Sequence, residues 1–338
     1  MVQVGIVGAS GFTGAELLRL CAAHPDLEVG LATGDTQAGR RAADLYPSLA
    51  GAYPELVLSA YDPADVAGLD LVFLGLPHGA SQAVVPELLG KVGHVVDLAA
   101  DFRLQDADLY PQWYGEAHTT PELLSRFAYG LPELFRAEIL ASDHVATPGC
   151  YPTAAALPLA PLVRGGLVEP EGIVVDAASG VSGAGRPAKP TTTFCAVDED
   201  FTAYGLLDHR HTPEMEQVLG ASVLFTPHLA PMNRGILATC YARATRPTST
   251  TEVLDRLRDA YASEPFVVVT DVSPSTKATL GSNCAQVTAR FDERTGWVVA
   301  IGAIDNLTKG ASGAAVQCAN LLLGLPETAG LPTVGVYP

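Results

Sequence analysis

The N-terminal segment constrains the fold of this chain more than any other feature. Residues 2–7 form an apolar run typical of a buried strand, and residues 15–23 repeat apolar side chains with helical periodicity. Between them stands Gly8-Ala9-Ser10-Gly11-Phe12-Thr13-Gly14. Glycines here allow a tight turn and let the backbone approach a pyrophosphate resting on the helix N-terminus. The spacing is G-x-x-G-x-x-G, so a purely structural turn is the alternative, but the flanking strand and helix favour a Rossmann dinucleotide-binding domain.

The second predicted strand, residues 28–32, bears on the choice of cofactor. An NAD-binding domain usually ends this strand with an acid that bonds the ribose 2′-hydroxyl. Here Thr33-Gly34 stands at the tip, and Arg40-Arg41 follows a few residues on. A hydroxyl and nearby arginines suit the 2′-phosphate of NADP, whereas Asp35 argues against it because a carboxylate repels a phosphate. We predict NADP, with Thr33 among the residues that bind it.

Further strands alternate with helices in the first half of the chain. The predicted strands are residues 69–74, 95–98 and 145–147, and the segments that follow them include the loop 76–81, Arg103 and Cys150. Ligands in open α/β sheets bind outside the carboxyl ends of the strands. We therefore expect the glycine turn, this loop, Arg103 and Cys150 to converge on one ligand site.

The segment Thr147-Pro148-Gly149-Cys150-Tyr151-Pro152-Thr153 carries the strongest chemical signal. It precedes an apolar run, residues 154–162, that is typical of a helix, and Pro152 suits the first helical turn. A thiol at a helix N-terminus faces backbone N–H groups and the positive end of the dipole, which favour the thiolate. The same N–H groups could stabilise an oxyanion. A buried structural cysteine is the alternative, but this setting favours a nucleophile.

A second chemical cluster is His209-Arg210-His211-Thr212-Pro213-Glu214. Two histidines could supply the general acid and base that acyl chemistry needs near neutral pH. On an extended segment both would point to the same side with Arg210 turned away, whereas on a helical turn they would diverge. Solvated histidines are the alternative. We expect no metal, because further ligands with a fitting spacing are missing.

The second half of the chain contains many predicted strands and few predicted helices, unlike the first half, where strands and helices alternate. Strands fit residues 173–178, 221–225, 235–242, 266–269, 284–291 and 297–303, with a helix at 251–261 and an apolar helix at 311–323. Many strands with few helices predict an α+β domain with a largely antiparallel sheet. One face of such a sheet needs a cover, so we expect a homodimer or homotetramer formed through this domain.

Composition excludes several classes of function. The 338 residues are 48% hydrophobic and 17% charged, which allows a sizeable core and suggests about two domains. The net charge of −17 argues against nucleic acid and against an anionic membrane surface. Six cysteines without paired spacing indicate a reduced, cytoplasmic protein. Because residues 2–7 already read as a buried strand, we expect no signal peptide before the fold. The cations expected to hold anionic ligands are Arg103, Arg186, Lys189 and Lys309.

Eight segments together resemble one family. They are residues 8–20, 76–79, 100–103, 130–133, 148–153, 179–186, 209–214 and 304–310, in the order in which the family carries them and spread over nearly the whole chain. The chain resembles the N-acetyl-gamma-glutamyl-phosphate reductase family, the NADPH-dependent enzymes of arginine biosynthesis within the aspartate-semialdehyde dehydrogenase-like superfamily. The related carrier-protein-linked enzymes of lysine biosynthesis usually carry Gly-Cys-Asn-Ala-Thr, and Tyr151-Pro152-Thr153 here points to the N-acetyl substrate instead.

The resemblance implies a set of roles. It implies Cys150 as nucleophile and His209 with His211 as acid and base, with His209 our choice for the direct participant. It also implies a dinucleotide-binding domain over residues 1–149 to which the C-terminal segment 311–338 returns, and a catalytic and oligomerisation domain over 150–310. The remaining implied cofactor contacts are Pro77, Ser182, Gly183 and Asn306, and the basic residues expected to clamp phosphate or carboxylate are Arg103, Arg186 and Lys189.

Three alternatives stay open at this point. Aspartate-semialdehyde dehydrogenase performs the same chemistry on a shorter acid, and a carrier-protein-linked acyl-phosphate reductase performs it on a tethered one. A non-catalytic dinucleotide-binding sensor would keep the glycine turn but would need neither a cysteine at a helix start nor a histidine pair.

Overall fold

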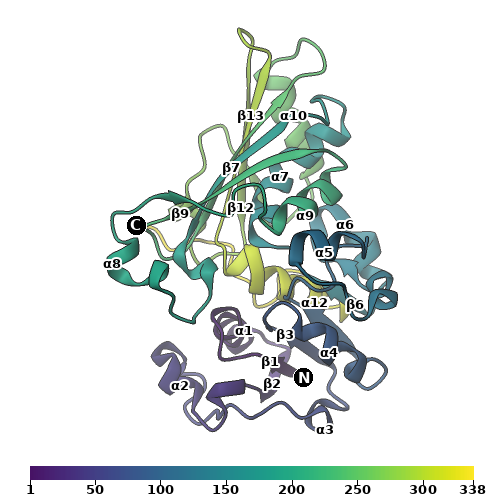
Figure 1. Cartoon of the computed structure of the whole chain (residues 1–338), viewed down its shortest axis with the longest axis vertical. Helices are drawn as coiled ribbons and strands as arrows, with labels where there is room; N and C mark the ends of the chain where they lie inside the picture. The colour runs from purple at the N-terminus through teal and green to yellow at the C-terminus, as the bar shows by residue number, and fades with distance from the viewer. The chain divides into compact units, whose positions relative to one another are not determined.

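The computed structural model describes residues 1–338, which form two compact units. The first unit comprises Met1–Pro148 and Ala311–Leu331, and the second comprises Gly149–Gly310 and Pro332–Pro338. The chain therefore leaves the first unit at Pro148, returns to it with the helix near the C-terminus, and ends with seven residues that pack in the second unit (Figure 1). No helix combines the length and the apolar character that spanning a bilayer requires.

The first unit is built on a six-stranded sheet in which every neighbouring pair is parallel. Its strand order is β2-β1-β3-β4-β6-β5, so the predicted α/β Rossmann class is confirmed. Parallel strands are covered on both faces, which explains why β3 and most of β1 read as continuous apolar runs. The strands are β1 (Val2–Val7), β2 (Leu27–Ala32), β3 (Leu71–Leu74), β4 (His94–Asp97), β5 (Ala128–Tyr129) and β6 (His144–Ala146).

The helices of this unit connect and cover those strands. The longer ones are α1 (Phe12–Ala23), α4 (Ala80–Leu88), α5 (Leu109–Tyr114), α6 (Pro132–Leu140) and α12 (Gly313–Leu322). Short turns are α2 (Ala42–Leu45), α3 (Pro63–Val66), η1 (Asp35–Gln37), η2 (Pro47–Leu49) and η3 (Pro121–Arg126). Helix α12 packs on α1, α6 and β4, which places a C-terminal segment in the N-terminal unit.

The second unit contains a seven-stranded mixed sheet with the order β11-β12-β13-β10-β7-β9-β8. The pairs β7/β9 and β11/β12 are parallel and the other four are antiparallel, so the predicted largely antiparallel sheet is confirmed. The strands are β7 (Ile173–Gly180), β8 (Thr202–Ala203), β9 (Val223–Ala230), β10 (Ile236–Arg243), β11 (Val267–Val269), β12 (Ala285–Asp292) and β13 (Trp297–Ile304).

One face of this sheet is covered by helices of the same unit. Burial alternates along β7 and β10, as expected when only one face packs on a core. Helix α7 (Cys150–Arg164) packs across β10, β12 and β13, with α9 (His211–Leu219) and α10 (Thr250–Ala260) beside it (Figure 1). The remaining elements are α8 (Phe194–Val197), α11 (Thr276–Thr279), η4 (Val181–Ala184), η5 (Pro190–Thr192) and the π-helical turn η6 (Thr308–Ser312).

Strand β9 differs from its predicted extent. The sequence indicated residues 221–225, and proline, which cannot donate to a sheet ladder, is rare inside strands. The observed strand runs through Pro227 to Ala230. Pro227 is tolerated because it lies beside the two-residue strand β8, where its carbonyl accepts the N–H of Tyr204 at 3.1 Å.

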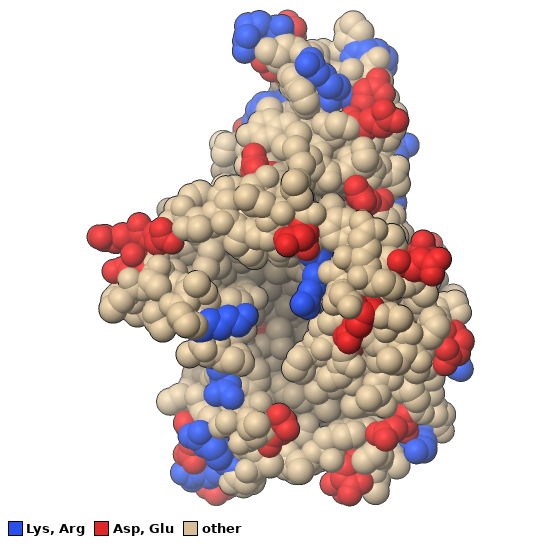
Figure 2. Space-filling model, in the orientation of Figure 1, with Lys and Arg blue, Asp and Glu red and all other residues tan.

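Acidic residues outnumber basic residues in this chain, 37 to 20. On the face drawn in Figure 2, lysines and arginines occur in small groups interspersed with acidic residues. Few cations are therefore available for any anionic ligand, which makes those inside cavities informative.

Candidate active site

A cavity of about 890 Å³ in the second unit contains the predicted chemical groups. Its lining includes Cys150, His209, His211 and Lys189, which come from separate segments of the chain. Gly183, one of the expected cofactor contacts, lines it as well. The structure thus brings the two motifs with the strongest chemical signals into one hollow.

Cys150 is the first residue of α7, and Gly149 is its N-cap. Gly149 has no side chain to cap this end of the helix, and the thiol lies at the positive end of the helix dipole. Pro152 lies in the first turn, where a missing N–H is tolerated. The helix start predicted from the sequence is therefore observed, and helix α7 extends to Arg164.

The other five cysteines are less suited to nucleophilic chemistry. Cys21, Cys240, Cys284 and Cys318 are buried, whereas Cys150 is half-buried and Cys195 is exposed. Burial raises the pKa of Cys21 to about 12 and also raises the pKa values of Cys240 and Cys284. Cys195 does not line the cavity, so Cys150 is the cavity's one thiol.

The start of α7 is tied to the histidine segment. The backbone N–H of Gly149 donates to Oε1 of the buried Glu214 at 2.7 Å. A Cβ added to Gly149 would collide with the imidazole of His211, so only glycine permits this approach. His211 begins α9, and Glu214 lies one turn later on the same helix. One helix therefore places a histidine against the residue that precedes the thiol.

His209 lies in an aromatic surrounding just before α9. Its ring is 5.6 Å from the rings of Tyr151 and Tyr204, 5.2 Å from Phe225 and 4.8 Å from His211, measured between centroids. Burial lowers the pKa of His209 to about 4. The backbone N–H of His211 donates to Nδ1 of His209 at 3.1 Å, so the neutral ring carries its proton on Nε2.

Of the two conformations considered for the histidine segment, the structure has the helical turn. Arg210 has helical dihedral angles, φ −58° and ψ −20°, so the segment is not extended. Both histidines nevertheless line the cavity, and Arg210 lines it with them instead of turning away. The alternation of a strand does not apply, because His209 lies before the helix and His211 is its first residue.

The three predicted substrate-binding cations have different positions. Lys189 lines the cavity. Arg186 is half-buried and is not among the lining residues. Arg103 belongs to the first unit, where it is buried and its Nη2 donates to the carbonyl of Leu98 at 2.8 Å. Arg210 is the cation that sequence reasoning missed, although it lies between the two histidines that the motif singled out.

The glycine turn of the first unit has the form that a dinucleotide requires. Gly8 has φ +94°, and a Cβ there would collide with the carbonyl of Gly75. Helix α1 follows with Gly11 as its N-cap and no side-chain cap, which suits a phosphate at the helix N-terminus. Ser10, Phe12, Thr13 and Gly14 complete the segment. These residues fit a dinucleotide pyrophosphate.

Thr33 has a supporting position in this turn. It is 2% exposed, and its Oγ1 accepts the N–H of Gly8 at 3.2 Å while its carbonyl accepts that of Ala9 at 2.7 Å. The hydroxyl thus holds the turn in place. The exposed charged residues near the strand tip are Asp35, Arg40 and Arg41, of which Arg41 pairs with Asp44 at 2.9 Å.

The loop that contains Pro77 is held by a buried carboxylate that the sequence did not reveal. Asp101 accepts the N–H groups of Gly79 and Ser81, at 2.8 Å and 3.0 Å, and lies 2.5 Å from Nδ1 of His78. These contacts to the backbone and to His78 keep the pKa of Asp101 below its usual range in spite of burial. Asp101 stands in the segment 100–103, so the motif was visible but the contact was not.

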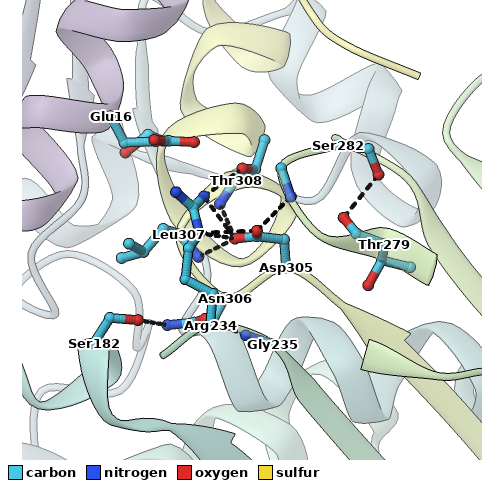
Figure 3. Close-up of polar contacts among 12 residues, drawn as sticks. Glu16, Ser182, Arg234, Gly235, Thr279, Ser282, Asp305, Asn306, Leu307 and Thr308 are labelled. Carbon is cyan, nitrogen blue, oxygen red and sulfur yellow. Dashed lines mark hydrogen bonds and ion pairs between the residues drawn. The ribbon is translucent and has the colours of Figure 1, made fainter. Parts of the chain in front are cut away.

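Ser182 and Asn306, two of the expected cofactor contacts, meet in the second unit. Nδ2 of Asn306 donates to Oγ of Ser182 at 3.0 Å, and the N–H of Gly235 donates to Oδ1 of Asn306 at 2.7 Å (Figure 3). Ser182 follows β7 and Asn306 follows β13, and β10 lies between these two strands in the sheet, so folding brings together residues that are 124 positions apart in the sequence.

Comparison with known proteins agrees with this architecture. Residues 3–142 match the model of the semialdehyde dehydrogenase NAD-binding domain, and residues 150–306 match that of the semialdehyde dehydrogenase dimerisation domain. Fold and site together define the class as a semialdehyde dehydrogenase-type oxidoreductase.

Full-length relatives narrow this class. N-acetyl-gamma-glutamyl-phosphate reductase of Citrifermentans bemidjiense is 47% identical over 100% of both chains. The protein of the same name from Symbiobacterium thermophilum is 48% identical over 100% of this chain and 99% of its own. The chain belongs to the N-acetyl-gamma-glutamyl-phosphate reductase family.

Solved structures show the same fold at much lower identity. Aspartate semialdehyde dehydrogenase II of Vibrio cholerae, complexed with ASA, superposes with a TM-score of 0.72 at 17% identity and covers 96% of this chain and 98% of its own. The enzyme of Candida albicans, solved with NADP, gives a TM-score of 0.71 at 16% identity over 96% of this chain and 99% of its own.

Proposed function

We propose that this chain reduces N-acetyl-gamma-glutamyl phosphate to N-acetylglutamate 5-semialdehyde and phosphate, with NADPH as reductant and Cys150 as nucleophile. The identity of 47% over the full length of a reductase of that name supports the substrate. The single observation that carries the mechanism is the helix-start thiol in one cavity with two histidines and Lys189.

The chemistry follows from the residues around the cavity. The Cys150 thiolate attacks the acyl carbonyl, the carbon–oxygen bond to phosphate breaks, and a thioester forms. Lys189 and Arg210 provide positive charge for the phosphate and carboxylate of the substrate. NADPH, when bound, supplies the hydride that reduces the thioester carbon.

The histidine pair then carries out the transfer of one proton. His209 is neutral at pH 7 and carries its proton on Nε2, so it can donate to the developing alkoxide of the thiohemiacetal. His209 then takes this proton back from the hydroxyl, and the alkoxide collapses to the aldehyde as the carbon–sulfur bond breaks and the Cys150 thiolate leaves. His211 packs on Gly149 and orients the helix start. Comparing kcat of His209→Ala and His211→Ala decides which of the two histidines is the direct participant.

The substrate is tested by running the reaction in reverse. Phosphate-dependent reduction of NADP⁺ is measured with N-acetylglutamate 5-semialdehyde and with aspartate semialdehyde side by side. We expect the N-acetylated substrate to give the higher kcat/KM. A preference for aspartate semialdehyde favours the alternative, an aspartate-semialdehyde dehydrogenase, whose fold this chain shares. A carrier-linked acyl phosphate as the only substrate points to the lysine-type reductase, and binding of NADP⁺ without turnover points to a sensor.

The cofactor choice gives a prediction about two exposed arginines. The variant Arg40→Ala/Arg41→Ala should lower kcat/KM for NADPH by roughly 10-fold or more, since hydrogen bonds to a charged phosphate contribute about 1.5–3 kcal/mol. The value for NADH should not change. Steady-state kinetics with both cofactors measure this, and Arg258→Ala, a surface arginine of the second unit, is the control. If NADH equals or exceeds NADPH in the unmodified enzyme, Asp35 binds the ribose hydroxyls instead.

The second sheet supports an oligomer. The residues of β7 and β10 that alternate with the buried ones stay half-exposed, because the helices of this unit cover only the opposite face. A second copy of the chain would bury this face, and the domain matches the dimerisation model. We predict a homodimer or homotetramer, and light scattering coupled to gel filtration measures it. A monomer at micromolar concentration contradicts this proposal.

All six cysteines are free thiols. Free thiols persist in reducing compartments, so a cytoplasmic location is part of the same proposal.

A further inference from the structure

A buried ion pair lies at the end of the second sheet, outside the lining of the Cys150 cavity. Asp305 follows β13 directly and is 0% exposed. Arg234 precedes β10 and approaches the carboxylate with two nitrogens, Nε at 2.9 Å from Oδ2 and Nη2 at 2.9 Å from Oδ1 (Figure 3). This forked geometry fixes orientation as well as distance.

The carboxylate also organises three backbone segments. Asp305 accepts the N–H groups of Gly281 at 2.7 Å, Leu307 at 2.8 Å and Thr308 at 3.0 Å (Figure 3). Nη2 of Arg234 donates in addition to Oγ1 of Thr308 at 2.9 Å. One side chain thus joins the loop after α11, the loop before β10 and the first turn after β13.

Two chains of contacts lead from this pair to the site. The carbonyl of Asp305 accepts the N–H of Gly310 at 2.9 Å, and Gly310 packs so closely on Cys150 that an added Cβ would lie 2.9 Å from the cysteine Cβ. The next residue, Asn306, holds Ser182 through its side-chain amide.

The Arg234 loop supports Ser182 from the other side. The N–H of Val181 donates to the carbonyl of Met232 at 2.9 Å, and the N–H of Ser182 donates to that of Asn233 at 3.1 Å. The loop around Arg234 and the turn after Asp305 therefore both contact the Ser182 turn, and the ion pair locks these two segments together. Replacing Arg234 would leave the buried Asp305 carboxylate with its three backbone donors alone and would remove the link between these two segments.

We propose that Arg234 and Asp305 form a positioning pair that sets the place of the Cys150 sulfur and of the Ser182–Asn306 contact. Neither residue lines the cavity, so the pair acts through Gly310 and Asn306. Buried ion pairs contribute little net stability, whereas misplacement of reacting groups by about 1 Å costs about 10²-fold in rate. The inference rests on the proposed role of Cys150.

The test compares kcat with simple thiol reactivity. In Arg234→Ala we expect kcat to fall by roughly 10²-fold. Alkylation of Cys150 by iodoacetamide should keep its wild-type rate, because that small reagent needs no positioning and α7 stays intact. Arg234 is 23% exposed, so added guanidinium at millimolar concentration can reach the vacated site and should restore part of kcat, whereas sodium chloride at equal ionic strength should not.

Matched variants keep the result decisive. Arg243→Ala removes an arginine from the other end of β10, where it bonds the carbonyl of Thr295 and stacks on Trp297, and should leave kcat unchanged. If Arg234→Ala does not fold by circular dichroism, Arg234→Lys replaces it, which keeps the charge but loses the fork. Wild-type kcat in a folded Arg234 variant, or lost activity that guanidinium does not restore, overturns the proposal. Full activity of Cys150→Ser would instead contradict the proposed function itself.

Discussion

Cys150→Ser is expected to abolish turnover, with a fall in kcat of at least about 10³-fold. A serine hydroxyl at the same helix start stays protonated near neutral pH, so it cannot form the acyl intermediate that the thiolate forms. Binding of NADPH should be nearly unchanged, because the glycine turn belongs to the other unit. Steady-state kinetics and a fluorescence titration with NADPH measure the two quantities.

Cys195→Ser is the matched control for this variant. Cys195 is exposed and is absent from the cavity lining, so its replacement should leave kcat unchanged. The same variant provides a clean background for alkylation, since the other four cysteines are buried. In that background, loss of activity with iodoacetamide at pH 7 should follow labelling of Cys150. Normal activity in Cys150→Ser would contradict the proposed mechanism.

His209→Ala should lower kcat by roughly 10²–10⁴-fold, the usual size of a general acid–base contribution. His211→Ala should cost less if His211 serves mainly to pack on Gly149 and hold the helix start. Measuring kcat for both variants assigns the roles. A larger loss in His211→Ala reverses the assignment, and a change of only a few-fold in both means that the pair is structural.

The pH profile gives an independent check on His209. Burial lowers its pKa to about 4, so the ring stays neutral through the range in which an ordinary histidine becomes charged. Activity that depends on the neutral ring should therefore persist below pH 6 and decline only as the pH falls towards 4. The measurement is kcat/KM against pH in the wild-type enzyme and in His209→Ala. An acid limb near pH 6.5 that survives in the variant assigns that limb to another group.

Local sequence signals were sufficient for the main elements and for the position of Cys150 at a helix start. Alternation and apolar runs placed the main strands to within a few residues, because period and turn residues are local properties. The same holds for Cys150, since a Pro-Gly turn before an apolar run places it at a helix start regardless of what packs around it. The glycine turn likewise indicated its own backbone conformation, which Gly8 adopts.

Tertiary structure decided the partners of these groups. Gly149 and Glu214 are 65 residues apart, and Arg234 and Asp305 are 71 apart, so no local pattern could pair them. Thr33 shows the same limit, because the contact of its hydroxyl with the N–H of Gly8 joins residues 25 positions apart. The bond from Arg103 to the carbonyl of Leu98 was likewise not indicated by the sequence.

Local patterns along the chain were enough to predict the two-sheet α/β plan, the dinucleotide turn and the thiol at a helix start. The structure decided which side chains share the cavity and that Arg210 is one of them. It also decided the burial of His209, which lowers the pKa of that ring to about 4. The physical reason is that helix starts and turns depend on neighbouring residues in the chain, whereas burial and hydrogen-bond partners depend on strands and helices that meet only after folding.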